Sequence, residues 1–372
     1  MKKVAILVFN NFTHDNRVLR EGLSLKDAGY DVQIVALHEG DLPKKEIKNG
    51  LKIDRLSLIS RGLPKSIFFQ IFKWLELFIL IAKRYRKTDF FHVCDVLPLP
   101  MAIWTKRLFN RSIKVIYDAH EMEFQKNTSS KRYGQLIAWL EDKHLRQANA
   151  IMTVTEPIAE AYKEHYNIEK PSVIHNFPFK QEVGKHNKFR ERFNIRPEQR
   201  ILLYQGTISP NRGCEQLVEA FKHMPDNVVL VLLGYGPIWN KIKDLSSGMD
   251  NVFMHEAVGM NELLQYTSSA DFGAYSVINT NPSHDYSLGN KVFEYLMAGL
   301  PVISTNLKGV RAFLKEDFTV FIDDINTDSL NKAIQHFDSL DQVKLEKDIK
   351  DFTEYANWDK EQQKLLNIYE NA

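Results

Sequence analysis

A loop that leads into a helix offers the richest chemistry in this sequence. Residues 283–304 contain a Ser-, Gly- and Asn-rich loop, a helix predicted to begin near Asn290, and Lys291 in its first turn. A helix N-terminus presents unpaired N–H groups and the positive end of the helix dipole, which favour a phosphate. A lysine there is unfavourable unless an anion lies nearby. The segment therefore predicts an anion site, with a surface charge on a solvated loop as the alternative.

A second cation, Arg212, could likewise belong to an anion site or be a surface charge. Arg212 lies in the loop after the apolar run 202–204, which we expect to be a buried strand. Ligands of open α/β sheets bind beyond the carboxyl ends of strands. An arginine fork suits the oxygens of phosphate groups.

The motifs of several common enzyme classes are absent. No Gly-x-Gly-x-x-Gly follows the first predicted strand, which disfavours a dehydrogenase, and no P-loop is present, which disfavours a kinase or ATPase. The chain has no Asp-x-Asp pair to hold a metal-bound nucleotide and no Gly-x-Ser-x-Gly nucleophile elbow. We therefore expect no metal and no cofactor.

Composition narrows the class of protein further. The 372 residues carry 49 Lys and Arg against 47 Asp and Glu, a net charge of +2, which disfavours a nucleic-acid binder. The two cysteines, Cys94 and Cys214, cannot build a disulfide framework or a zinc knuckle. The apolar run at the N-terminus is too short for a signal peptide. We expect a cytoplasmic protein.

Strands and helices alternate along the chain. The apolar run 4–9, a helical pattern over 18–28 and a second run at 31–36 predict one βαβ unit, and the alternation restarts at 200–204. This pattern predicts an α/β protein with two doubly wound, Rossmann-like domains. We expect residues 1–178 to form the first domain and residues 179–354 the second. The natural active site is then the cleft across which the two domains face each other.

The residues of the loop-helix segment carry a family resemblance. The sequence from Asn290 to Ile303 closely resembles the donor-binding motif of glycosyltransferase family 4, which has the GT-B fold. Other stretches resemble family segments in the same order, namely 17–21, 28–32, 117–121, 173–176, 204–206, 212–213, 234–237 and 270–273. Residues 355–372 resemble the terminal helix that returns to the first domain. The resemblance covers nearly the whole chain.

This resemblance implies retaining transfer of a sugar from a nucleotide-diphosphate donor. The second domain would bind the donor and the first would bind the acceptor. Glu294 would hold the ribose hydroxyls, Arg212 would bridge the phosphates, and His120 would contact the donor sugar. The full set of expected donor residues is Gly206, Gly234, Val258, Asp285, Tyr286, Ser287, Leu288, Gly289, Asn290 and Glu294. The expected catalytic residues are Arg212, Lys291 and His120, and the expected acceptor residues are Asn11, His14, Asp15 and Glu121.

The sequence departs from the family pattern at the phosphate and sugar positions. Tyr286 stands where the family has the first of two paired glutamates, so either Asp285 substitutes or the sugar hydroxyls are bound differently. Thr207 replaces the arginine of a Gly-Arg pair, and Lys291 is the candidate replacement cation. Asn11 stands in a first loop that is glycine-rich in many relatives.

Other interpretations remain open for single residues and for the function of the whole chain. His120 could cap a strand end, and His14 with Asp15 could be an N-cap pair for the first helix. Asp118 is expected to tie down its own loop. A GT-B sugar-nucleotide epimerase would share the nucleotide site but would need no acceptor. A two-domain sugar-binding protein without activity is the third class.

Residues 65–87 form an unusually apolar predicted helix with a basic end. Aromatic residues gather in its first half, and Lys83, Arg84, Arg86 and Lys87 end it. This composition suits a helix at the inner face of an anionic membrane, which would fit a glycan or lipid-linked acceptor of a surface polysaccharide. A helix buried on one face and covered on the other is the alternative.

Overall fold

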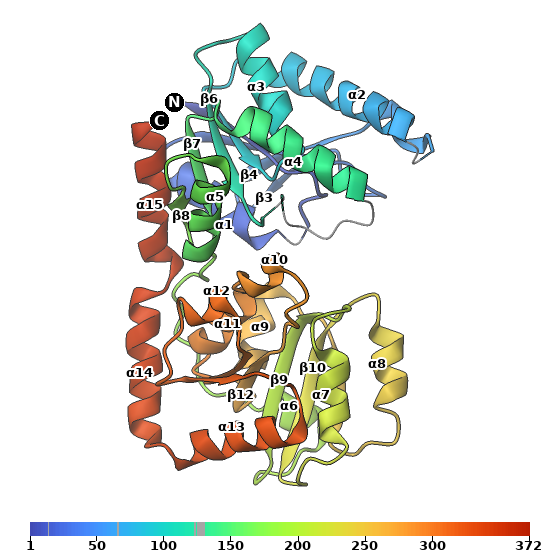
Figure 1. Cartoon of the computed structure of the whole chain (residues 1–372), viewed down its shortest axis with the longest axis vertical. Coiled ribbons are helices and arrows are strands. Elements are labelled where there is room, and N and C mark those ends of the chain that lie inside the picture. The colour runs from blue at the N-terminus through green and yellow to red at the C-terminus, as the bar shows by residue number, and fades with distance from the viewer. Residues whose placement is uncertain (14, 65–66, 123, 125–130) are drawn as a thin grey trace. The chain divides into compact units, whose positions relative to one another are not determined.

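The computed structural model describes residues 1–13, 15–64, 67–122, 124 and 131–372. The chain divides into two compact units (Figure 1). Unit 1 comprises Met1–His175 and Glu361–Ala372, and unit 2 comprises Asn176–Lys360. The divisions thus fall after residues 175 and 360, whereas the sequence led us to place them after 178 and 354. Within unit 2, the Trp358 N–H donates to the Pro178 carbonyl at 2.8 Å.

Unit 1 contains an eight-stranded sheet. The strand order is β3-β4-β2-β1-β5-β6-β7-β8, with every neighbouring pair parallel except β3 and β4. The strands are β1 Lys3–Leu7, β2 Asp31–Leu37, β3 Lys45–Lys48, β4 Leu51–Leu56, β5 Phe90–Cys94, β6 Lys114–Ala119, β7 Ala150–Thr153 and β8 Ser172–Val173. The central strands β1 and β5 are almost entirely buried, which is typical of a parallel sheet covered by helices.

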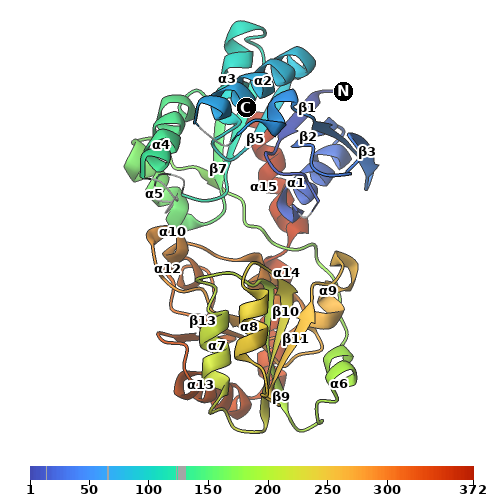
Figure 2. The ribbon, with the colours of Figure 1, turned by 90° about the vertical axis from the view of Figure 1, so that its right-hand side faces the viewer.

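Helices cover both faces of this sheet. They are α1 Asn16–Asp27, η1 Ile59–Gly62, α2 Ile67–Tyr85, α3 Leu99–Leu108, α4 Lys131–Leu145, α5 Glu156–Tyr166 and α15 Trp358–Asn371. The crossovers through α2, α3 and α4 all step in one direction along the sheet, so right-handed connections place these helices on one face. α1 steps the other way and contacts α15, where Ser24 Oγ donates to Gln362 at 2.9 Å. Figure 2 shows α15 beside α1.

Unit 2 contains a six-stranded, fully parallel sheet. The order is β11-β10-β9-β12-β13-β14. The strands are β9 Arg200–Thr207, β10 Val228–Tyr235, β11 Val252–Glu256, β12 Phe272–Tyr275, β13 Val302–Thr305 and β14 Thr319–Ile322. The helices are α6 Lys188–Phe193, α7 Cys214–Phe221, α8 Trp239–Leu245, α9 Met260–Thr267, α10 Pro282–Asp285, α11 Asn290–Met297, α12 Lys308–Arg311, α13 Thr327–Ser339 and α14 Gln342–Tyr355.

The connections of unit 2 set which helices meet. The crossovers through α7 and α8 run in one direction along the sheet, and those through α9 and α11 run in the other. α9 and α11 therefore share a face and contact each other. Both units are doubly wound α/β folds, so the fold class expected from the sequence is confirmed.

Candidate functional site

The strand order locates the edge of each sheet at which a ligand can bind. In unit 2 the chain reverses direction between β9 and β12, so the crevice lies beyond the carboxyl ends of these two strands. In unit 1 the reversal lies between β1 and β5. Nearly all of the residues expected to act on substrate follow one of these strands or a neighbour.

Two cations meet at the carboxyl end of β9. Lys291, in the first turn of α11, lies with Nζ 3.8 Å from the centre of the Tyr204 ring. It also lies against Gly206, since a Cβ built on that glycine would be 3.3 Å from Nζ. Burial, and then the charge of Arg212, lower the pKa of Lys291 to about 7. Two cations that repel each other at a strand end suit an anion, which would stabilise both charges.

A tight backbone turn presents Arg212. Its carbonyl accepts a hydrogen bond from Ser276 Oγ at 2.7 Å, and its N–H donates to the Ser209 carbonyl at 3.3 Å. The next residue, Gly213, has φ +75° and begins α7 as its N-cap. A Cβ on Gly213 would lie 2.1 Å from the Ser276 carbonyl oxygen, so only glycine fits there.

Glu294 lies one turn further along α11 and is hydrogen-bonded to β9. Gln205 Nε2 donates to Glu294 Oε2 at 2.6 Å. The adjacent Tyr295 hydroxyl accepts from the Gln205 N–H at 2.9 Å and donates to the Ala274 carbonyl at 3.2 Å. Helix α11 is thus fastened to β9 and β12 at the point where Lys291 and Glu294 emerge. The sequence did not single out Gln205, although a polar residue at the end of the apolar run 201–204 was a visible signal.

Hydrogen bonds and an ion pair fix the loop that precedes α11. The Tyr275 hydroxyl accepts from the Gly289 N–H at 3.1 Å and lies 3.2 Å from Ser287 Oγ. Asp285 accepts from the Lys308 N–H at 3.1 Å and pairs with the Lys308 ammonium at 3.2 Å. Asp285 therefore has a structural partner, and its suggested role as a substitute for the missing family glutamate gains no support from these contacts.

The other expected donor residues lie around the same strands. The ring of Tyr286 faces the Lys308 ammonium, whose nitrogen is 5.4 Å from the ring centre. Leu288 is buried in the unit 2 core, and Val258 packs against that core from the loop between β11 and α9. The Asn290 Oδ1 atom accepts from Asn176 Nδ2 at 2.5 Å.

Gly234 has a packing reason to be glycine. It lies near the end of β10, where a Cβ would come within 1.9 Å of the Gly206 carbonyl oxygen. The close approach of β10 to β9 therefore requires glycine at this place, whether or not the backbone also contacts a donor.

Unit 1 gathers buried charges around Asp118 at the end of β6. The Arg17 guanidinium donates to both Asp118 oxygens, at 2.7 and 2.8 Å, and to the Ile174 carbonyl at 2.8 Å. His120 Nε2 lies 2.6 Å from Asp118 Oδ2, and its Nδ1 lies 3.8 Å from Asp95 Oδ1. Asp118 thus ties together a helix, a strand end and His120, which is more than the local loop contact we expected.

The charges of this cluster support one another. Burial alone would lower the pKa of His120, but the carboxylates of Asp118 and Asp95 raise it to about 10. The imidazole is therefore protonated at neutral pH, and both ring nitrogens carry a proton. Burial opposes ionisation of Asp118, yet Arg17 and His120 hold the pKa of its carboxyl well below the usual range. Asp95, with φ +65°, was not singled out from the sequence.

Two of the expected acceptor residues are occupied by local contacts. Asp15 caps α1, accepting from the Val18 N–H at 3.1 Å, and this confirms the N-cap interpretation for Asp15. Asn11 Nδ2 donates to Glu39 at 2.9 Å. Glu121 is exposed after β6, and His14 lies outside the described residues.

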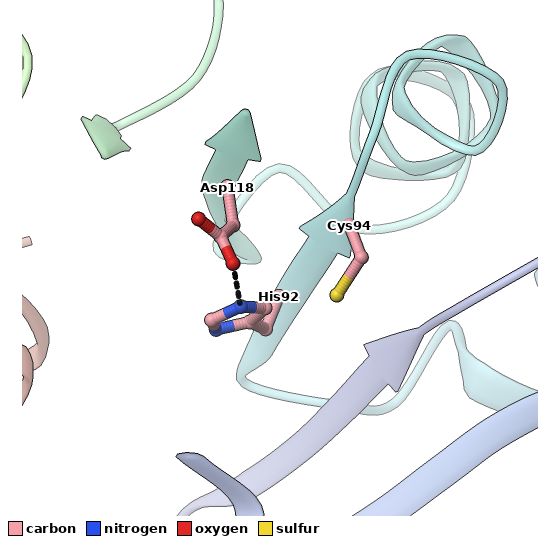
Figure 3. A group of neighbouring side chains, drawn as sticks. All are labelled: His92, Cys94 and Asp118. Carbon is pink, nitrogen blue, oxygen red and sulfur yellow. Dashed lines mark ion pairs between the residues drawn. The ribbon is translucent and has the colours of Figure 1, made fainter. Parts of the chain in front are cut away.

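His92, Cys94 and Asp118 lie close enough to suggest a metal site, with ligand atoms within 4.8 Å of one another (Figure 3). Their surroundings do not suit a metal ion. Arg17 occupies both Asp118 oxygens and would repel a cation, while His92 Nδ1 lies 2.8 Å from the Tyr369 hydroxyl. Burial, and then nearby carboxylates, raise the pKa of Cys94 well above its usual range, so its thiol stays protonated. The group belongs to the charge cluster of unit 1.

Two family descriptions match the chain, one in each half. Residues 16–177 match Glycosyltransferase Family 4, and residues 185–356 match Glycosyl transferases group 1. The chain belongs to glycosyltransferase family 4. The resemblance stated from the motifs is therefore confirmed.

Curated relatives of this glycosyltransferase are distant. An uncharacterized glycosyltransferase of Methanocaldococcus jannaschii is 22% identical over 379 residues, covering 95% of this chain and 92% of that protein. D-inositol 3-phosphate glycosyltransferase of Xylanimonas cellulosilytica is 28% identical over 158 residues, which are 40% of this chain but only 34% of that relative. The lipopolysaccharide glucosyltransferase WaaG of Escherichia coli is 20% identical over 206 residues, covering 51% of this chain and 53% of WaaG.

Solved structures share the fold over the whole glycosyltransferase chain. Sucrose-phosphate synthase from Thermosynechococcus elongatus has a TM-score of 0.79 at 19% identity and covers 100% of this chain and 98% of its own. Anabaena HepE, solved in complex with UDP-glucose, has a TM-score of 0.78 at 12% identity and covers 100% of both chains. At these identities the likeness establishes the GT-B fold.

Proposed function

We propose that this glycosyltransferase moves a hexose or related sugar from a nucleotide-diphosphate donor to a glycan or lipid-linked acceptor, with retention of configuration. The observation that carries the proposal is that Lys291 and Arg212 both lie beyond the carboxyl end of β9, with Glu294 one turn along α11. A diphosphate supplies the anion that two such cations require. The carboxylate next to it suits the hydroxyls of a ribose.

Charge development explains why the two cations serve catalysis. Breaking the bond between sugar and phosphate leaves negative charge on the diphosphate and positive character on the sugar ring. Arg212 and Lys291 stabilise the leaving diphosphate in the role that a metal ion fills elsewhere. The departing phosphate oxygen then accepts the proton of the acceptor hydroxyl on the same face of the sugar. We assign no protein nucleophile.

His120 is a positively charged residue of unit 1. Its raised pKa keeps it protonated, so it can donate a hydrogen bond to a substrate oxygen and cannot be a general base at neutral pH. Arg17 holds Asp118, and Asp118 holds the ring of His120. The rigid support suits a group that must keep one position.

We propose synthesis of a surface polysaccharide or lipopolysaccharide as the setting. The partial match to WaaG of Escherichia coli, a lipopolysaccharide glucosyltransferase, supports this. The likeness to HepE with bound UDP-glucose makes UDP and UDP-glucose the first ligands to test.

Thermal shift with nucleotide diphosphates and nucleotide sugars tests the donor site. A ligand at 100-fold its Kd should stabilise the protein by about 2.7 kcal/mol. Product analysis then separates transfer from epimerisation, because an epimerase would convert the nucleotide sugar with no acceptor present. No stabilisation by any of UDP, GDP, ADP and CDP or their sugars would contradict the donor site.

We also propose that α2 contacts the inner face of an anionic membrane, which would place the enzyme in the cytoplasm. Among the described residues, no helix has the length and apolar composition needed to cross a bilayer. Residues 65–66 of the predicted helix lie outside the described residues. Within α2, Leu77 and Ile81 are buried, whereas the opposite face bears exposed apolar side chains between 42% (Leu75) and 60% (Ile79) accessible. The other two members of this row are Ile71 and Phe72.

Helix α4, which α3 connects to α2, also bears exposed apolar side chains. α3 contacts both α2 and α4, and Trp104 of α3 packs edge-on against Trp74 of α2 and against His144 of α4. α4 also exposes apolar side chains, including Leu136 and Trp139. Exposed cations follow at the carboxyl ends of these helices, namely Lys83, Arg84, Arg86, Lys87, Arg107 and Lys143. An apolar surface with a basic border suits anionic lipid.

Vesicle flotation tests the membrane contact. The enzyme should float with phosphatidylcholine vesicles that contain phosphatidylglycerol and bind pure phosphatidylcholine less. The double variant Ile71→Ser, Ile79→Ser should lose binding, whereas Ile47→Ser, at an exposed apolar residue of β3, should retain it. Folded enzyme that binds neither vesicle at low salt would contradict the proposal.

A further inference from the structure

A buried amide connects Glu294 to a second helix. Gln205 is only 2% exposed, near the carboxyl end of β9. Its Nε2 donates to Glu294 Oε2 at 2.6 Å, and its Oε1 accepts from Thr267 Oγ1 at 2.8 Å. Thr267 is the last residue of α9 and is fully buried. The side chains form a chain of hydrogen bonds from α9 through β9 to α11.

The carboxylate fixes the direction of this chain. With the amide turned over, Gln205 Oε1 would face the Glu294 oxygen at 2.6 Å, and two acceptors cannot bond. The N–H therefore points to Glu294, which leaves the amide oxygen toward the Thr267 hydroxyl. That hydroxyl lies 2.8 Å from both Gln205 Oε1 and the Leu263 carbonyl, so these two acceptors share its single proton. A buried amide would be costly to leave without partners, so the arrangement is stable.

Such a chain controls where the carboxylate can point. A glutamate on the first turns of a helix has several rotamers, and holding one of them for a ligand requires a supporting contact. The 2.6 Å bond to a charged acceptor is of the strong kind. The backbone N–H of Gln205 is fixed as well, by the Tyr295 hydroxyl at 2.9 Å, so the amide cannot drift along the strand.

We propose that Gln205 is a positioning residue that aims the Glu294 carboxylate at the ribose hydroxyls of the donor, and that Thr267 sets the orientation of the Gln205 amide. The inference rests on the proposed function of Glu294 as the ribose-binding residue. It adds two residues, from β9 and α9, that neither the motifs nor the comparisons assign.

Binding of nucleoside diphosphates and their 2′-deoxy forms tests this proposal. The probe is whichever of UDP, GDP, ADP and CDP binds the full-length enzyme most tightly, measured by calorimetry beside its 2′-deoxy analogue. The enzyme should prefer the ribonucleotide by about tenfold, the worth of one good hydrogen bond to a charged group. Gln205→Leu should weaken ribonucleotide binding about tenfold more than binding of the deoxynucleotide, which offers Glu294 only the 3′-hydroxyl, so the preference disappears.

The variants at Thr267 supply a graded test with conservative rescue. Thr267→Val should reduce the preference for ribose, and Thr267→Ser, which keeps the hydroxyl, should retain it. Thr319→Val is the matched control, because Thr319 is buried in the same unit and its hydroxyl has no hydrogen-bond partner among the residues that the structure describes. It should keep the full preference.

The outcomes separate this inference from the proposed function. The positioning role is wrong if Gln205→Leu weakens binding of the ribonucleotide and the deoxynucleotide equally. It is also wrong if Gln205→Leu keeps the preference for ribose while its unfolding temperature matches that of the Thr319→Val control. If Glu294→Ala itself keeps the preference for ribose, the ribose role of Glu294 is wrong. Loss of the preference for ribose in Glu294→Ala, Gln205→Leu and Thr267→Val, with the preference of Thr267→Ser unchanged, supports the series of hydrogen bonds from Thr267 through Gln205 to Glu294.

Discussion

The ammonium of Lys291 lies over the face of the Tyr204 ring, 3.8 Å from its centre. The lysine leaves the first turn of α11 and reaches the end of β9, where Gly206 leaves room for it. The aromatic face stabilises part of this charge. It does not offset burial and the repulsion from Arg212, which together lower the pKa of Lys291, and this supports the proposed diphosphate site.

Affinity for the nucleotide sugar should fall as the pH rises above 7. Burial and the charge of Arg212 lower the pKa of Lys291 to about 7, so the side chain is charged below that pH and neutral above it. The anion binds the charged form, so binding above pH 7 requires proton uptake and should weaken by up to about tenfold per pH unit. Calorimetric titrations from pH 6 to 8.5 measure this. Lys291→Met should bind weakly with a flat profile, and equal wild-type affinity across the range would contradict the assignment.

Arg212→Ala should reduce kcat more than it raises KM. The negative charge on the diphosphate grows in the transition state, so the lost cation matters most there. The expected loss in kcat is about 10²–10³, comparable with removal of one oxyanion donor. Steady-state kinetics check this, with Arg196→Ala, a surface arginine of the same unit, as control. Near-normal kcat in Arg212→Ala would remove this residue from the reaction.

Glu294→Ala should act mainly on donor affinity. Contacts to the ribose are similar in the ground and transition states, so KM for the donor should rise while kcat changes little. Loss of hydrogen bonds to a charged group predicts a rise of about 10- to 100-fold. A fall in kcat with unchanged KM would place Glu294 at the reacting sugar instead.

Transfer should continue in the presence of EDTA. Arg212 and Lys291 supply two positive charges for the leaving group, and the sequence lacks an Asp-x-Asp pair. Activity of enzyme dialysed against EDTA should equal that of enzyme supplied with Mg²⁺ or Mn²⁺. A strict metal requirement would mean that the diphosphate is held somewhere other than between these cations.

Arg17→Met should destabilise unit 1 strongly. Arg17 is 3% exposed and bonds both oxygens of the fully buried Asp118, so its loss leaves a buried carboxylate without its main partner. Removal of one member of a buried pair costs about 3–5 kcal/mol. Urea unfolding measures the loss. Adding Asp118→Asn to Arg17→Met should recover part of the stability, and a single variant as stable as wild type would show that the pair is not required.

Much of the fold could be predicted from the sequence, because its signals are local. Apolar runs such as 228–233 form buried parallel strands, and helical periodicity between them gives the doubly wound order. The proximity of the two cations proposed for the anion site was predictable for a similar reason. Lys291 in the first turn of a helix and Arg212 after a strand are unfavourable places for a cation, and the topology brings both to one edge of the sheet.

The partners of these residues depend on contacts between segments far apart in the chain. Asp285 is close in sequence to Glu294, yet it binds Lys308, and Asp118 binds Arg17 about a hundred positions away. Gln205 reaches Glu294 and Thr267 only because α9 and α11 cover the same face of the sheet beside β9.

The sequence by itself therefore determined the fold class, the family and the cations that we propose for the donor site. Tertiary structure alone decided which carboxylates are used for structure and which buried amide holds Glu294. The reason is physical: strand and helix formation depends on the period of neighbouring side chains, whereas the pairing of a buried polar group depends on which distant atom packing brings within about 3 Å.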